Sequence, residues 1–159
     1  MIHLIFGLLI ENIRSRPLSI SANLVLIFSI LVFTIGITYT ADWFLYDWIY
    51  KTEDDTTDFV FYELSKLFNQ YQLEFEDLYI FHIVCSLLIY FILITRFTRN
   101  YFYVFLIYIL LDYVHFTNQI RYYLGLPILL TGYYFLFYRK KYIISIILIG
   151  FSLLCHVGL

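Results

Sequence analysis

The sequence predicts an all-α protein, namely a polytopic membrane helical bundle with about five transmembrane helices and an outward amphipathic helix. The chain of 159 residues is 62% hydrophobic and only 14% charged, whereas a soluble domain has roughly 25% charged residues. The apolar residues form long runs, and most charged residues lie between these runs. Lipid satisfies no backbone polar group, so we expect the runs to cross the membrane as helices.

Five apolar runs approach the length of about 20 residues that a helix needs to cross the hydrocarbon. They are Leu18–Ala41, Leu78–Thr95, Tyr101–Thr117, about Gln119 to Tyr138, and Tyr142–Leu159. The stretch from Ile2 to Ile13 is short for a span, and we interpret it as an interfacial segment or the remainder of a longer span. We therefore divide the chain into an apolar N-terminal segment, residues 1–17, and a transmembrane bundle, residues 18–159.

Basic residues indicate which loops share one side of the membrane. If the chain crosses five times, three basic groups lie on the same side: Arg14 with Arg16, Arg96 with Arg99, and Arg139–Lys141. Cytoplasmic loops hold the excess of lysine and arginine, so we assign these groups to the cytoplasm. Residues 42–77 then form an extracytoplasmic loop.

The loop 42–77 holds nearly all of the acidic residues. Its apolar residues recur at helical spacing, at Val60, Leu64, Leu67, Phe68 and Tyr71. Polar residues occupy the opposite face, which predicts an amphipathic helix on the outer leaflet. The run Glu53-Asp54-Asp55 lacks the spacing and the glycine of a calcium loop, so we interpret it as a solvated turn and assign no metal.

Polar side chains in or beside membrane spans are candidate functional residues, because they are costly in lipid. Along the third predicted span, Tyr108, Asp112, His115 and Gln119 are separated by four, three and four residues. In a helix this spacing places them on one face. This face fits a hydrogen-bond network between helices and a substrate-lining stripe about equally well. At the outer end of the fourth span, Arg121 either reaches the lipid headgroups or grips a phosphate. His156 is either a packing residue or a base.

The overall charge and the cysteines exclude other classes of protein. A net charge of −2 and a pI of about 6.0 argue against a nucleic acid partner. Cys85 and Cys155 lie in separate apolar runs without metal-ligand spacing. We interpret both cysteines as packing residues.

Three short motifs follow one another along the chain. The first, Asp42-Trp-Phe-Leu-Tyr46, comes directly after the first long apolar run. The second, Asn118-Gln-Ile-Arg121, opens the fourth predicted span. The third is the pair Lys140-Lys141, followed by an apolar run that ends in His156. The first two motifs and His156 lie at the predicted outer end of the bundle. The pair Lys140-Lys141 lies in the predicted cytoplasmic loop before the last span.

In their order and spacing, these motifs resemble the EpsG-type exopolysaccharide polymerases, relatives of the Wzy O-antigen polymerases of bacterial envelopes. The resemblance extends over about residues 35–159 and covers the N-terminal portion of such an enzyme. The chain departs from the family pattern at three points. Thr40 stands in place of a glycine, and the arginine that the family usually has upstream of it is missing. Tyr122 replaces a glutamine, and the final His-x-Ser is His156-Val-Gly158.

The resemblance implies a glycosyltransferase that joins oligosaccharide units carried on a polyprenyl diphosphate, at the outer face of the bacterial cytoplasmic (inner) membrane. It implies no cofactor. Arg121 is expected to contact the diphosphate, and Asp42 and His156 are expected to act as acid, base or sugar-positioning groups. Further substrate-binding candidates are Tyr46, Asn118, Gln119, Asp112 and His115.

EpsG-type enzymes continue through several more spans, so we expect a truncated form whose activity is in question. Its expected partners are membrane lipid and a missing C-terminal half or other polysaccharide assembly proteins. The alternative is a small membrane transporter or an accessory subunit of a polysaccharide export system. In that case Asp112 and His115 would form a path for protons or ions.

Overall fold

The computed structural model describes residues 42–53, 58–98 and 120–156, and the single positions 21, 24, 25, 28, 32 and 107. Within these three ranges every regular element is an α-helix, which confirms the all-α class for this part of the chain. In order, the helices are α3 (Trp43–Thr52), α4 (Phe59–Gln70), α5 (Phe75–Phe97), α7 (Ile120–Phe137) and α8 (Tyr142–Cys155). Segment 1–17 and most of the predicted spans Leu18–Ala41 and Tyr101–Thr117 lie outside the described residues.

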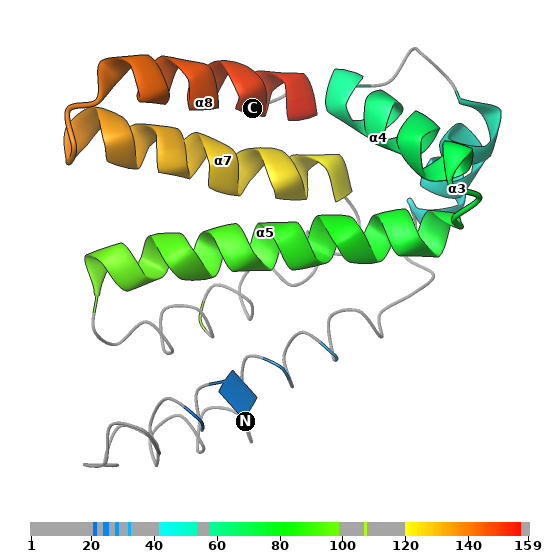
Figure 1. The fold of residues 1–159 in the computed structure, drawn as a ribbon, viewed down its shortest axis with the longest axis horizontal. Coiled ribbons are helices and arrows are strands. Elements are labelled where there is room, and N and C mark those ends of the chain that lie inside the picture. Colours follow the sequence, from blue (N-terminus) through cyan, green and yellow to red (C-terminus); the bar gives the residue numbers. More distant parts are fainter. Residues whose placement is uncertain are drawn as a thin grey trace.

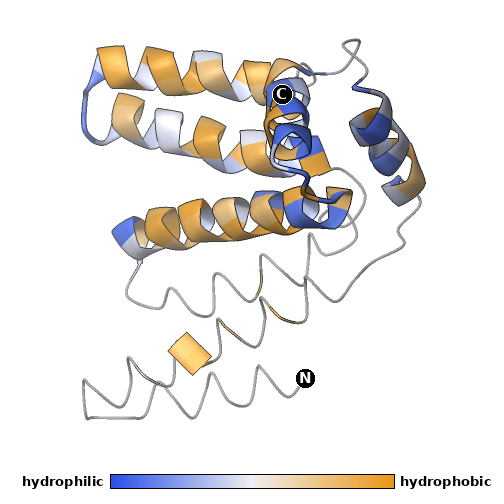
Figure 2. Cartoon of the chain, turned by 45° about the vertical axis from the view of Figure 1, so that its right-hand side comes forward, coloured by the Kyte–Doolittle hydropathy of each residue, from blue (hydrophilic) through white to orange (hydrophobic). Residues whose placement is uncertain are grey.

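The long helices α5, α7 and α8 lie side by side, and α7 contacts both of the others (Figure 1). Helices α3 and α4 gather at the end where α5 begins, and α4 also reaches α8. In Figure 2 the middle of the long helices is mainly hydrophobic, and hydrophilic residues lie toward their ends. This pattern is typical of helices whose middle avoids water.

Helix α5 has 23 residues, and it is the one helix of the described part that is long and apolar enough to cross a membrane. At 1.5 Å per residue it extends about 35 Å, enough for a hydrocarbon layer of about 30 Å. It begins three residues before the predicted Leu78, because a capping box stabilises its first turn. There the backbone N–H of Glu74 donates to Asp77 Oδ2 at 3.0 Å.

Helices α7 and α8 form an antiparallel pair whose backbones approach closely. A Cβ atom added to Gly132 would lie 2.8 Å from Ile149 Cγ1 and 3.3 Å from the backbone nitrogen of Ile149. Two small side chains of α8, Ser145 and Ser152, are fully buried. Small residues of this kind let neighbouring helices pack without a wide side-chain layer between them. Helix α8 is a shorter apolar helix, and the count of five spans stays a prediction.

Helix α4 confirms the predicted helix of the loop, and its buried face overlaps the predicted one in part. Val60 is buried, and Leu64 and Phe68 pack against the core. Leu67 and Tyr71 are exposed, whereas Phe61 and Ser65 are almost completely buried. The reason is that Phe61 and Phe68 face α5, with their rings 5.8 Å from His82 and 5.5 Å from Phe81 respectively. Its position on the outer leaflet stays a prediction.

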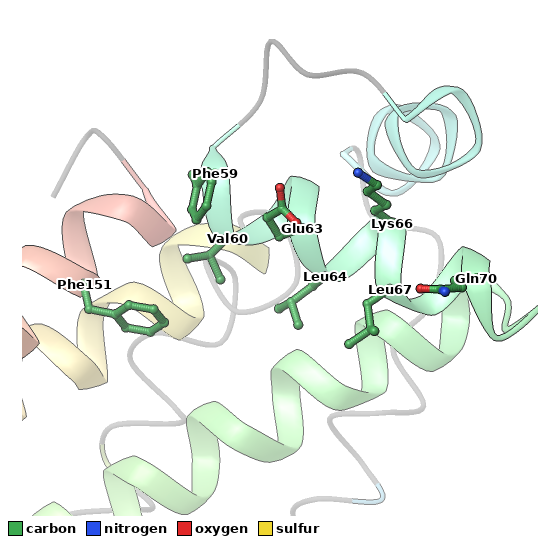
Figure 3. A pocket seen from close by; sticks show the side chains of 8 residues that line it. All are labelled: Phe59, Val60, Glu63, Leu64, Lys66, Leu67, Gln70 and Phe151. Carbon is green, nitrogen blue, oxygen red and sulfur yellow. The ribbon is translucent and has the colours of Figure 1, made fainter.

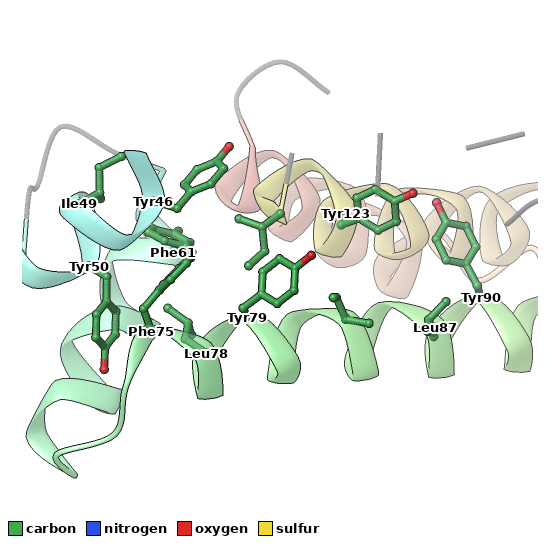
Figure 4. Packing of buried hydrophobic residues seen from close by; sticks show 12 residues of the cluster. Tyr46, Ile49, Tyr50, Phe61, Phe75, Leu78, Tyr79, Leu87, Tyr90 and Tyr123 are labelled. Carbon is green, nitrogen blue, oxygen red and sulfur yellow. The ribbon is translucent and has the colours of Figure 1, made fainter. Parts of the chain in front are cut away.

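Aromatic rings join α3 and α4 to the first turns of α5. The ring of Trp43 meets Phe75 at 4.9 Å and Tyr79 at 4.7 Å, both edge-on, and Tyr46 lies 5.6 Å from Phe61. Figure 4 shows Tyr46, Phe61, Phe75 and Tyr79 between the helices. Edge-on contacts are favourable for aromatic pairs beyond the area that they bury. Helix α3 is not among the elements predicted from the sequence, and this cluster explains why it forms there.

Candidate functional site

A buried carboxylate, that of Asp58, lies where α4 begins and binds side chains of α7 and α8. Arg121 Nη1 donates to Asp58 Oδ2 at 2.9 Å, and His156 Nδ1 lies 3.0 Å from the same oxygen. The side chain of Asp58 is only 8% exposed, against 20% for Arg121 and 28% for His156. We call these three residues the polar junction, because one oxygen connects three helices.

The folding of the chain explains how the junction assembles. Arg121 is the second residue of α7, and His156 follows the last residue of α8. Because α7 and α8 are antiparallel neighbours, these two positions meet at the open end of the pair. Asp58 occupies the N-cap position of α4, but its side chain does not cap that helix. Its carboxylate binds the other two helices instead.

Tyr46 of α3 supports Arg121 from a second direction. Arg121 Nε donates to the Tyr46 hydroxyl at 3.4 Å, and Arg121 Cζ lies 5.1 Å from the centre of the Tyr46 ring. Tyr46 is itself buried, and Phe61 packs against its ring. A guanidinium that is bonded at its edge and covered on one face loses much of its freedom to move. The junction therefore presents a positive charge in a fixed place.

The contacts of His156 define which ring nitrogen carries a proton. A carboxylate can only accept hydrogen bonds, so Nδ1 donates to Asp58, and in the neutral ring Nε2 is left as an acceptor. Tyr122 lies edge-on to the imidazole at 6.0 Å between ring centres. A histidine oriented in this way by a carboxylate has the arrangement of a general base.

A groove with mainly apolar walls begins beside the junction (Figure 3). Its volume is about 440 Å³, and its lining includes Phe59 and Val60, the two residues that follow Asp58. Phe151 of α8 forms part of the opposite wall, and the charged side chains of Glu63 and Lys66 also line the groove. The groove therefore combines hydrocarbon-like walls with two charged side chains, and its first lining residue, Phe59, directly follows Asp58.

A second pocket of about 480 Å³ lies around α3 and the start of α5, and it is more polar. Trp43 and Tyr50 supply aromatic surface to it, and Asp47, Glu74 and Glu76 supply carboxylates. Aromatic surface together with hydrogen-bonding groups suits a polar ligand that has an apolar face.

The structure brings Tyr46, Arg121 and His156 together, three of the residues that the sequence singles out. Asp42 lies at the N-cap of α3, one turn before Tyr46. Within residues 42–53, 58–98 and 120–156, its side chain bonds to neither Arg121 nor His156, and Asp58 is the acidic partner instead. The other predicted site residues lie outside the described ranges, namely Asp112, His115, Asn118 and Gln119.

Asp58 is the site residue that the sequence analysis missed. An aspartate directly before an amphipathic helix is typical of an N-cap, and it lies among many acidic residues of one loop. Neither feature indicates burial, and its partner His156 is 98 positions away. As for metals, the described positions contain no group of three or more His, Cys, Asp or Glu residues that could hold an ion.

These observations define a class of protein, a helical bundle with an apolar helix of membrane-spanning length and a buried charged cluster at one end. The EpsG family model matches residues 22–158, so the chain belongs to the EpsG family, as the motifs predict. This family is membrane-associated, and membership suggests a role like that of a polysaccharide polymerase. No curated protein and no solved structure matches the chain.

Proposed function

We propose that the protein is a polysaccharide polymerase of the bacterial cytoplasmic membrane, a glycosyltransferase that joins oligosaccharide units carried on a polyprenyl diphosphate. The observation that carries this proposal is the polar junction. There a guanidinium and an imidazole share the buried carboxylate of Asp58 beside an apolar groove. Membership of the EpsG family supports the same reaction class.

Arg121 stabilises the diphosphate leaving group in this proposal. When the bond between the sugar and the diphosphate breaks, the electron pair stays on the phosphate oxygen and negative charge builds up there. A guanidinium already held in place stabilises that charge without reorganising. It has five N–H donors, and its described contacts use those on Nη1 and Nε. A planar guanidinium also matches the geometry of phosphate oxygens.

His156 acts on the acceptor sugar. The acceptor hydroxyl oxygen attacks the anomeric carbon of the donor, and His156 Nε2 takes the hydroxyl proton as the new bond forms. Asp58 stabilises the resulting imidazolium through its bond to Nδ1. Atoms and charge balance, because the proton moves to the imidazole and the diphosphate leaves with its electron pair.

The two hollows suit the two parts of such a substrate. The apolar groove beside Asp58 offers a place for the polyprenyl chain, with Phe59 and Phe151 in contact with it. The polar pocket near Trp43 offers stacking and hydrogen bonds to a glycan. A site for this substrate needs both an apolar groove and a polar pocket, because the substrate is apolar at one end and polar at the other.

The proposal requires the junction to face outward, which labelling of introduced cysteines tests. A cysteine at Thr56 should react with a membrane-impermeant thiol reagent outside intact cells, and one at Thr98 only after permeabilisation. Cys155 is replaced in both variants to remove its signal. The reverse labelling would place Arg121 and His156 in the cytoplasm and contradict the proposal.

The activity itself is tested in a strain that lacks its polysaccharide polymerase. The chain is expressed alone and together with a C-terminal half from a longer family member. In whichever of these two conditions long-chain polysaccharide is restored, Arg121→Ala should abolish its synthesis, and lipid-linked units should accumulate. Arg139→Gln, which removes an exposed cation from the turn between α7 and α8, is the matched control. Normal chain lengths with Arg121→Ala at equal expression, or no restoration in either arm, would overturn the proposal.

A further inference from the structure

A third, smaller cavity lies between α5 and α7, at the end of α5 that is opposite to α3 and α4. It has a volume of about 180 Å³. Its walls come from Ile89, Ile92 and Leu93 of α5 and from Tyr134 and Phe135 of α7, and Arg96 also lines it. An apolar cavity of about 150 Å³ stays dry and accepts a small hydrocarbon. The walls of this cavity therefore favour a hydrocarbon chain over water.

Arg96 is a basic residue in the lining of this cavity, and three more basic residues lie in the turn between α7 and α8. Arg96 lies in the last turn of α5. The next residue, Phe97, contacts Tyr134 at 5.4 Å and Tyr138 at 5.0 Å, which brings the end of α5 to the turn between α7 and α8. That turn continues with Arg139, Lys140 and Lys141, all exposed. Figure 2 shows both the end of α5 and the turn as hydrophilic at the same end of the bundle.

This concentration of positive charge has no acidic counterpart nearby in the part of the chain that the structure describes. Every aspartate and glutamate of residues 42–53, 58–98 and 120–156 lies between Asp42 and Asp77, in α3, α4, their flanks or the first turn of α5. The ion pairs among these residues also lie at that end or at the polar junction. The basic end therefore suits an anionic ligand from outside the chain.

We propose that this cavity binds an anionic phospholipid of the surrounding membrane. The phosphate of the lipid would bind Arg96, and the part of one acyl chain nearest the headgroup would lie between α5 and α7. A guanidinium and a phosphate form charge-assisted hydrogen bonds, and each basic residue near a membrane surface strengthens attraction to anionic lipid by about fivefold. The site is independent of the polar junction, and it does not rest on the proposed enzymatic activity.

The combination of an apolar cavity and a basic rim favours a lipid over other anionic ligands. A free phosphate would use Arg96 and leave the apolar walls empty. A zwitterionic lipid would fill the walls, but its own cation would weaken the attraction to the four basic residues, Arg96 and Arg139–Lys141. An anionic phospholipid satisfies both parts of the site.

The test measures the binding of fluorescent dioleoyl phosphatidylglycerol to the full-length protein in detergent micelles. Unlabelled phosphatidylglycerol, phosphatidylcholine and glycerol 1-phosphate compete for the site in separate arms. The variant is Arg96→Gln, which removes one exposed charge. Lys51→Gln is the matched control, because Lys51 is also exposed but lies on α3, at the other end of α5. Helicity and elution volume of each variant confirm that the chain is folded.

We expect phosphatidylglycerol to compete at least about fivefold better than phosphatidylcholine. Arg96→Gln should weaken binding by about fivefold, while Lys51→Gln leaves it unchanged. Glycerol 1-phosphate should fail to compete. Equal competition by both lipids would overturn the proposal, as would an equal loss in the two variants. Full competition by glycerol 1-phosphate would show a phosphate site rather than a lipid site and would also overturn it.

Discussion

The two ends of the α7–α8 pair are held together by different forces. Near the turn, Gly132 lets the backbone of α7 approach Ile149, and the contact depends on the absence of a side chain. At the open end, Arg121 and His156 meet through Asp58, which α4 supplies. The first contact joins residues that are near in sequence. The second needs a loop from an earlier part of the chain.

This difference separates structural packing from candidate chemistry. Close packing of small residues gives a rigid pair of helices and no reactive group. A buried carboxylate with two partners is costly to assemble, and its removal leaves charges unpaired. The open end therefore has the arrangement expected of a functional site, and the turn end provides the rigid support that positions it.

The largest effect is expected from removal of the shared carboxylate. Asp58→Ala leaves Arg121 without its partner in a site where little water enters, which should lower the free energy of unfolding by about 3–5 kcal/mol. Asp58→Asn keeps the shape and should cost less. Denaturant titration of the purified protein in detergent measures both. Equal stability of the Asp58→Ala variant and the unmodified chain would show that the junction holds nothing together.

A smaller effect is expected at the other end of the pair. Gly132→Val places atoms where Ile149 already lies, and overpacking of this kind costs about 1–3 kcal/mol. The same titration measures it, and Gly150→Ala is the control, because a Cβ atom at Gly150 would meet nothing within 4 Å. If the two glycine variants had the same stability, close approach would not be the basis of this packing.

Tyr50 tests a neutral contact away from both ends. Its hydroxyl donates to the carbonyl oxygen of Leu73 at 2.6 Å, so Tyr50→Phe should cost about 1 kcal/mol. Burial, and then the negative charges of Asp77, Glu53 and Glu74, raise the pKa of Tyr50. The native state therefore favours the neutral hydroxyl, and this contribution should be present below pH 10 and fall as the pH rises further. This account would be contradicted if the Tyr50→Phe variant lost stability above about pH 10 as steeply as the unmodified chain does.

The smallest effect is expected for an exposed ion pair. Lys51 Nζ lies 2.7 Å from Asp47 Oδ2 one turn away on α3, but its side chain is mostly in solvent. Lys51→Ala should change the free energy of unfolding by no more than about 0.5 kcal/mol. A loss as large as that of Asp58→Ala would mean that burial does not distinguish the two ion pairs.

The sequence predicts the long helices well, because their signals are local. Apolar runs and the charges that end them predict α5 and α7 to within about three residues, and α8 begins at the predicted Tyr142. Helix α3 is missed because its aromatic residues are stabilised by Phe75 and Tyr79 of α5. The face of α4 is predicted only in part for a similar reason, since Phe61 packs against His82.

The candidate site is predicted only in part. Tyr46, Arg121 and His156 are found through motifs, and each motif is a short stretch of sequence. Their acidic partner, Asp58, is not predicted, because nothing near Asp58 in the sequence indicates that α4 brings it to the end of α8. A contact between residues so far apart follows from tertiary packing rather than from a local pattern.

The most direct test of the polar junction is a double-mutant cycle between Asp58→Asn and Arg121→Gln, measured by denaturant titration in detergent. Residues that share a buried ion pair should show a coupling energy of at least about 1 kcal/mol. The exposed pair Asp47→Asn and Lys51→Gln is the control, with an expected coupling of about 0.3–0.5 kcal/mol. If the effects of Asp58→Asn and Arg121→Gln simply add, Asp58 and Arg121 do not act together and the junction is not a unit.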